Sequence, residues 1–170
     1  MKRYPIYLLI TLTFIELMVP LLVSGASFNS IENILNSYKK KLVVVEDLDQ
    51  DAREFFINSE KGTNPGIVRA DFNGDGIEDV AVLSKEGLKL FLRIFLCDKK
   101  CNEVKYVEAG PFDGIQYITP VKKGEIKHSV DGTSVKLKNT AIRLVDYGKA
   151  SAIYYWVKQT NDFTSIATGD

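Results

Sequence analysis

The sequence has few of the residues that most protein zinc sites use, with one histidine and two cysteines among 170 residues. A single histidine argues against a His-rich zinc site, and two cysteines are too few for a zinc ribbon. Charge of one sign is not in excess either, since 22 Lys and Arg balance 22 Asp and Glu. That balance removes the basic footprint of nucleic-acid binders and the polybasic attraction to anionic membranes. We therefore expect no nucleic-acid partner.

Long apolar runs are missing except near the start, over residues 6–23. Two basic residues precede this run and three small residues, ending at Ala26, follow it, a pattern typical of a secretory signal peptide. The alternative is an uncleaved membrane anchor. The run is, however, close to the shortest length with which a helix can cross a membrane, and Glu16 and Pro20 interrupt it. We predict a signal peptide over residues 1–26, export to the periplasm or the extracellular space, and no membrane association after cleavage.

The two cysteines, Cys97 and Cys101, enclose three polar residues between two strand-like runs. This arrangement predicts a hairpin with the cysteines facing each other across its base. An oxidising compartment favours a disulfide there. The alternative is a metal-binding or redox pair, but neither a histidine nor a further cysteine lies nearby in the sequence.

The residues after the signal peptide, 27–170, predict one α+β domain. Apolar spacing predicts a helix over 30–40, with Asn29 as its N-cap, and a second helix over 50–59, with Asp49 as its cap. Turn residues and period-two patterns then replace the helical signal. The fold we predict has two N-terminal helices packed on an antiparallel, meander-rich β-sheet, and it is not a propeller because no repeat is present. The strands are expected at 67–72, 79–84, 88–97, 104–108, 115–120, 134–138, 141–147, 150–157 and 163–167.

A nine-residue segment, DFNGDGIED, carries oxygen side chains at its positions 1, 3, 5 and 9 and glycine at position 6. Calcium takes six to eight oxygen ligands, and a tight loop can supply them from alternate positions. We predict one calcium ion bound by the side chains of Asp71, Asn73, Asp75 and Asp79 and the backbone carbonyl of Ile77. The alternative is an ordinary acidic turn, because Asp, Asn and Gly are also the residues that turns need.

This segment differs from an EF-hand loop, which needs Glu at position 12, where this chain has Val82. Residues 70–83 instead resemble the D-x-N-x-D-G-x-x-D calcium loops of FG-GAP and VCBS-type repeats, of the kind found in integrin α-chain propellers. That resemblance implies a calcium loop between two strands. The family normally carries several copies that form a propeller, whereas this chain has one, so the propeller is not expected here.

The chain as a whole also resembles small bacterial exported proteins that carry one such loop. In those proteins a helical segment precedes the loop and an aromatic strand lies near the end, matched here by Tyr154-Tyr155-Trp156 and by the closing residues 166–170. The resemblance implies export but supplies no activity.

The aromatic strand offers a candidate binding surface. Tyr154 and Trp156 point to one side of a strand, and Tyr155 points to the other with Ile153 and Val157. Because the aliphatic neighbours favour the Tyr155 side as core, we predict that Tyr154 and Trp156 are exposed and bind a protein or glycan partner. The alternative is that the two helices cover this pair.

No catalytic residue is predicted, because His128 has no nucleophile motif beside it. The sequence therefore indicates an exported, non-enzymatic calcium-loop domain with a binding or structural role in the cell envelope or the extracellular space. The alternative is a calcium-dependent hydrolase or a protein of the enzyme-inhibitor type. An ion beside a deep pocket would favour catalysis, and an ion on a surface hairpin would favour a scaffold.

Overall fold

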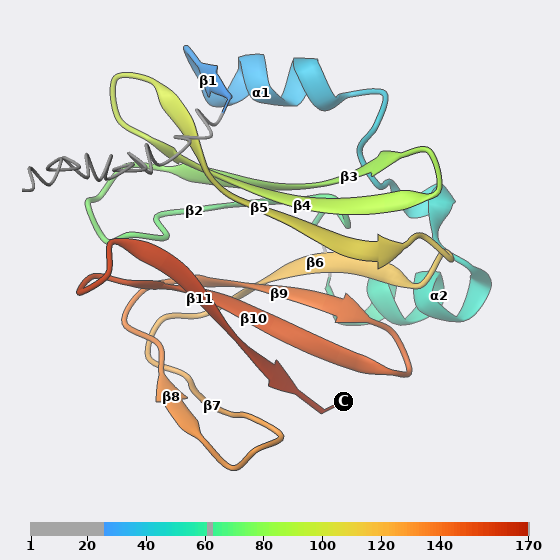
Figure 1. The fold of residues 1–170 in the computed structure, drawn as a ribbon. Coiled ribbons are helices and arrows are strands. Elements are labelled where there is room, and N and C mark those ends of the chain that lie inside the picture. Colours follow the sequence, from blue (N-terminus) through green and yellow to red (C-terminus); the bar gives the residue numbers. More distant parts are fainter. Residues whose placement is uncertain (1–25, 61–62, 170) are drawn as a thin grey trace, which may run out of the picture.

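The computed structural model describes residues 26–60 and 63–169, of which 49% lie in strands and 15% in helices (Figure 1). The predicted α+β fold, with two N-terminal helices packed on one sheet, is therefore wrong. A strand, β1, precedes both helices, and the strands form two main sheets. The predicted signal peptide lies outside the described residues, apart from Ala26. No helix among the described residues is long and apolar enough to cross a membrane.

The first sheet has five strands in the order β1-β5-β4-β3-β2, and all of its neighbouring strands are antiparallel. Two-residue β1 pairs with the start of β5, which explains why no strand signal was visible there. The bounds are β1 Ser27–Phe28, β2 Ile67–Ala70, β3 Asp79–Glu86, β4 Lys89–Cys97 and β5 Cys101–Pro111.

The second sheet has four antiparallel strands in the order β11-β10-β9-β6. A separate hairpin of β7 and β8 extends beyond it (Figure 1). The sequence predicted β8 but not β7. The bounds are β6 Gln116–Val121, β7 Ile126–His128, β8 Ser134–Lys136, β9 Ala141–Asp146, β10 Ala150–Val157 and β11 Asp162–Thr168.

The helices begin where side-chain oxygens cap them. Helix α2, Gln50–Ser59, has the predicted bounds, and the Asp49 carboxylate accepts the backbone N–H of Ala52 at 2.8 Å. Helix α1, Ile31–Tyr38, is capped one residue later than expected, by the hydroxyl of Ser30. A short 3-10 helix, η1 (Val45–Asp47), lies between them.

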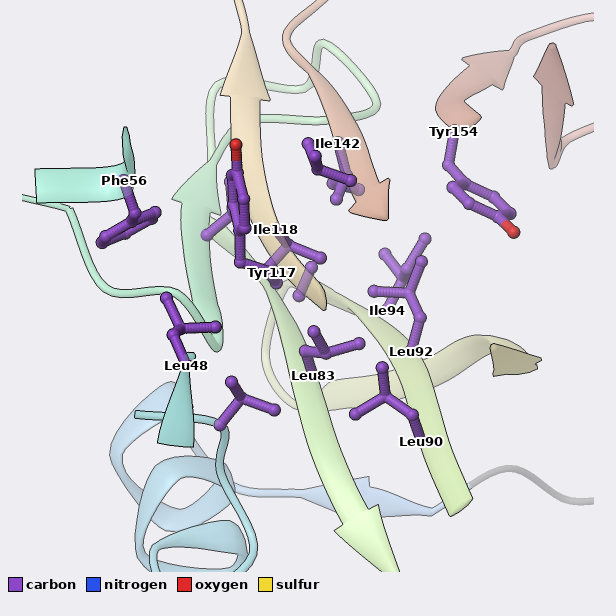
Figure 2. Packing of buried hydrophobic residues seen from close by; sticks show 14 of the residues in the cluster. Leu48, Phe56, Leu83, Leu90, Leu92, Ile94, Tyr117, Ile118, Ile142 and Tyr154 are labelled. Atoms are coloured by element: carbon purple, nitrogen blue, oxygen red, sulfur yellow. The ribbon is translucent and has the colours of Figure 1, made fainter. Parts of the chain in front are cut away.

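Three apolar clusters hold these layers together among the described residues. The largest lies between the two sheets and takes in Ala52 and Phe56 of α2, as Figure 2 shows for many of its members. The second joins α1 to the outer face of the first sheet, and the third joins the outer face of the second sheet to the β7–β8 hairpin. The two sheets thus form a β-sandwich, with α1 outside it and α2 beside one end (Figure 1).

Candidate metal centre

The predicted calcium loop, residues 71–79, connects β2 to β3 at the end of the sandwich that lies away from α2 (Figure 1). Its turn depends on Gly74 and Gly76, which both have φ of 85°, a conformation that disfavours residues with a Cβ atom. At Gly74 a Cβ atom would also lie 2.8 Å from the Asn139 side chain. The glycines therefore let the backbone curl tightly between the two strands.

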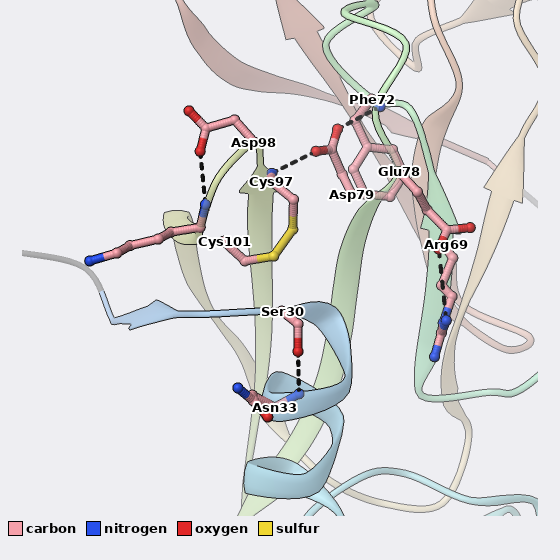
Figure 3. Close-up of a disulfide and its surroundings, with 10 residues drawn as sticks. Ser30, Asn33, Arg69, Phe72, Glu78, Asp79, Cys97, Asp98 and Cys101 are labelled. Carbon is pink, nitrogen blue, oxygen red and sulfur yellow. Dashed lines mark hydrogen bonds and ion pairs between the residues drawn. A yellow bond between two sulfur atoms is a disulfide. The ribbon is translucent and has the colours of Figure 1, made fainter.

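The last residue of the loop, Asp79, is fully buried. Its two carboxylate oxygens accept backbone N–H groups from opposite sides, one from Phe72 at 2.9 Å and one from Cys97 at 2.8 Å (Figure 3). Phe72 belongs to the loop, whereas Cys97 ends β4. Asp79 therefore ties the start of the loop to the neighbouring strand, a role that spacing along the sequence did not reveal.

Burial raises the pKa of Asp79 from 3.8 to about 6, because desolvation penalises the ionised carboxylate. The hydrogen bonds from Cys97 and Phe72 oppose this rise, and the negative charges of Asp75 and Asp71 add to it. The three carboxylates thus repel one another across the turn, and a bound cation would relieve that repulsion.

The other oxygen side chains of the loop fold back onto its backbone. The Asp71 carboxylate accepts N–H groups from Gly74 at 2.6 Å and from Gly76 at 2.9 Å. The Asn73 side-chain oxygen accepts the N–H of Asp75, and Asp75 accepts that of Ile77. Each of these oxygens retains a further lone pair, so the bonds that shape the turn leave the oxygens able to coordinate a hard cation.

The five predicted ligands thus share one turn, at different depths. Asp79 is buried and Asp75 is exposed, and the Ile77 side chain is 42% exposed. Within the described ranges, no group of three or more His, Cys, Asp or Glu side chains is gathered closely enough to hold a metal ion. Calcium binding would therefore draw the carboxylates closer together than they stand here.

The predicted disulfide is present, with 2.05 Å between the sulfur atoms of Cys97 and Cys101. The two cysteines are paired residues at the base of the β4–β5 hairpin, as expected. The Asp98 carboxylate accepts the backbone N–H of Lys100 within the hairpin loop (Figure 3). Because the Cys97 N–H bonds to Asp79, the disulfide hairpin and the candidate calcium loop are directly connected.

A small cleft of about 150 Å³ separates the loop from this hairpin. Asn73 and Asp75 line it from the loop, and Asp98 and Asn102 line it from the hairpin. The exposed side of the loop thus faces further oxygen-bearing side chains across the cleft. Spacing within the motif could not indicate Asp98 and Asn102, because both follow β4 in the sequence and reach the loop only in the folded chain.

The prediction that Tyr154 and Trp156 form an exposed pair is wrong. Tyr154 is only 9% exposed and belongs to the cluster between the sheets, where burial raises the pKa of its hydroxyl. Trp156 packs edge-on against Phe163, with 5.2 Å between ring centres. The first sheet covers this face, a partner that the sequence reasoning did not consider because it expected one sheet.

The single histidine has a neighbour that the sequence did not indicate. His128 Nδ1 lies 2.8 Å from the Ser134 hydroxyl oxygen, where β7 and β8 pair. Both residues are exposed on the outlying hairpin. Recognising β7 as a strand would have placed the two residues opposite each other.

Comparisons with protein-family models, curated proteins and solved structures found no match for this chain.

Proposed function

We propose that this protein is an exported, non-enzymatic β-sandwich domain in which the 71–79 loop binds one calcium ion. The ligands are the side chains of Asp71, Asn73, Asp75 and Asp79 and the carbonyl oxygen of Ile77. The observation that carries the proposal is the loop itself, in which oxygen ligands at alternate positions occupy a glycine-shaped turn between two strands.

The ion has a structural role in this proposal. Calcium would supply the positive charge that offsets repulsion among the three carboxylates of the loop. Asp79 connects the loop to β4 through the Cys97 N–H. Ordering of the loop would therefore stiffen the corner where β3, β4 and the disulfide hairpin meet, and the domain would serve in binding or support in the cell envelope or outside the cell.

Export is the second part of the proposal. It rests on the apolar start of the chain and on the Cys97–Cys101 disulfide, which persists in oxidising compartments. Intact-mass measurement of the protein recovered from the culture medium or periplasm tests this part. We expect a chain that begins near Ser27 and has no free thiol, whereas a full-length chain or two free thiols would contradict it.

The calcium site is tested by differential scanning calorimetry in chelator and in excess calcium. At a hundredfold excess over Kd, binding to the folded state alone adds about 2.7 kcal/mol, which raises Tm by several degrees in a domain of this size. Asp75→Ala should lose most of that rise. Glu78→Ala is the matched control, because Glu78 lies within the loop, outside the ligand set, and pairs loosely with Arg69 at 3.7 Å. Equal shifts in both variants would contradict the proposed ligand set.

A further inference from the structure

A pocket of about 380 Å³ lies beside α2. The 71–79 loop is at the opposite end of the sandwich from α2 (Figure 1). Phe55 of α2 lines it together with Tyr117 of β6, Arg143 of β9, and Tyr147 in the turn after β9. Pockets that hold small molecules begin at about this volume, and they combine apolar walls with a few polar groups. Phe55, Tyr117 and Arg143 are more than 20 residues from one another in the sequence, and Tyr147 closely follows Arg143. Only the folded chain therefore brings these side chains together.

The walls of this pocket suit a planar ring. The rings of Phe55 and Tyr147 lie 5.1 Å apart between centres, with an interplanar angle of 42°. The Phe55 side chain is 43% exposed although it is large and apolar. A flat apolar group seated here would cover exposed ring surface that water now contacts.

Arg143 provides the polar group. One of its terminal nitrogens, Nη2, lies 3.2 Å from the Glu60 carboxylate, which also accepts the hydroxyl of Thr119 at 2.7 Å. Glu60 thus holds the guanidinium in place along one edge. The Nε atom of Arg143 is buried and has no hydrogen-bond acceptor among the residues that the structure describes. The Arg143 side chain as a whole is 35% exposed, so its terminal nitrogens are the donors that a ligand oxygen in the pocket can reach.

We propose that this pocket binds a small planar carboxylate, with its ring against Phe55 and Tyr147 and its carboxylate on the guanidinium of Arg143. A carboxylate matches the forked donors of arginine better than a single acceptor does, because it can accept two parallel N–H bonds. Glu60 carries the opposing charge beside Arg143, so it limits the affinity for an anion while it orients the guanidinium.

Benzoate is the test probe and benzamide is its neutral, nearly isosteric control. Titration of the ¹⁵N-labelled protein, followed by NMR, should show benzoate shifting amides around Phe55, Tyr147 and Ser151, with at least tenfold weaker binding of benzamide. Arg143→Met should weaken benzoate binding at least tenfold. Glu60→Gln should strengthen it severalfold, because the competing carboxylate is gone while an oxygen acceptor for Arg143 remains.

Phe55→Ala is the second variant. The Phe55 ring is partly exposed and contributes little to folding, so this variant tests the pocket even if Arg143→Met fails to fold. It should weaken benzoate binding severalfold. The proposal would be overturned if benzoate and benzamide bound equally well, or if Phe55→Ala left benzoate binding unchanged. It would also be overturned if 10 mM benzoate, about the Kd expected for so small a ligand, caused no shifts around the pocket. None of these results depends on calcium, so the pocket and the calcium loop are tested separately.

Discussion

The buried carboxylate of Asp79 gives the calcium-free protein a characteristic pH dependence. The pKa of the Asp79 carboxyl is about 6 in the folded protein, against its ordinary value of 3.8, which we assign to the unfolded chain. The folded protein therefore binds a proton more tightly than the unfolded chain does. This stabilising effect is fully present below pH 3.8 and is lost as the pH rises through 6. Asp79 should thus make the folded protein more stable in mild acid than at neutral pH.

The size of this effect follows from the pKa difference. Each pKa unit corresponds to about 1.4 kcal/mol, so the whole rise amounts to about 3 kcal/mol. Between pH 7 and pH 5, where the group passes from mostly ionised to mostly protonated when folded, the free energy of unfolding should increase by about 1.4 kcal/mol. Asp79→Asn removes the titrating group, and every other titrating group is common to the two proteins.

Urea unfolding in chelator, followed by the fluorescence of the single tryptophan, measures this difference. We expect the stability of the wild type relative to Asp79→Asn to rise by about 1.4 kcal/mol from pH 7 to pH 5. Glu78→Gln, a change at the exposed neighbouring carboxylate, should retain the wild-type profile. A flat difference between wild type and Asp79→Asn, or one that falls toward pH 5, would refute the reasoning.

Three further changes test the packing. Trp156→Ala should destabilise the protein by about 2–3 kcal/mol in urea unfolding followed by circular dichroism, since it removes a half-buried ring that packs on Phe163; a loss below 0.5 kcal/mol would mean that the ring is free of the core. Gly66→Ala should destabilise it strongly, with a Tm at least 5 °C lower by calorimetry, because the new Cβ atom would lie 2.4 Å from the Val43 carbonyl oxygen; an unchanged Tm would contradict that close approach. Cys101→Ser should cost about 2 kcal/mol or less in urea unfolding, because the disulfide closes a very short loop; a loss of 4 kcal/mol or more would show that it holds more than its own hairpin.

Helices and strands could be predicted where the residues that specify them lie within a few positions of one another in the sequence. Helix α2 has its predicted bounds because Asp49 caps it and its apolar residues repeat at helical spacing. Strand β10 also has its predicted bounds, Ala150–Val157. At α1 two candidate caps, Asn29 and Ser30, stand side by side, and the sequence does not show which hydroxyl or amide reaches the first turn.

The second sheet and the pocket could not be predicted in this way. Alternation in β10 shows that two faces exist, yet both are covered, since Ile153 packs toward the β7–β8 hairpin and Tyr154 packs between the sheets. Which layer covers a face depends on contacts between distant segments, which periodicity does not encode. The buried bridge of Asp79 to Cys97 and the meeting of Phe55 with Tyr147 have the same origin.

Isothermal titration of calcium into the chelator-treated protein tests the central proposal most directly. We predict one ion bound per chain in the wild type and in Glu78→Ala, and loss of that binding in Asp71→Ala, which removes two oxygens from the first position of the loop. Folded wild-type protein that takes up no calcium, or Asp71→Ala that binds it as well as the wild type does, would contradict the account and leave residues 71–79 as an acidic turn.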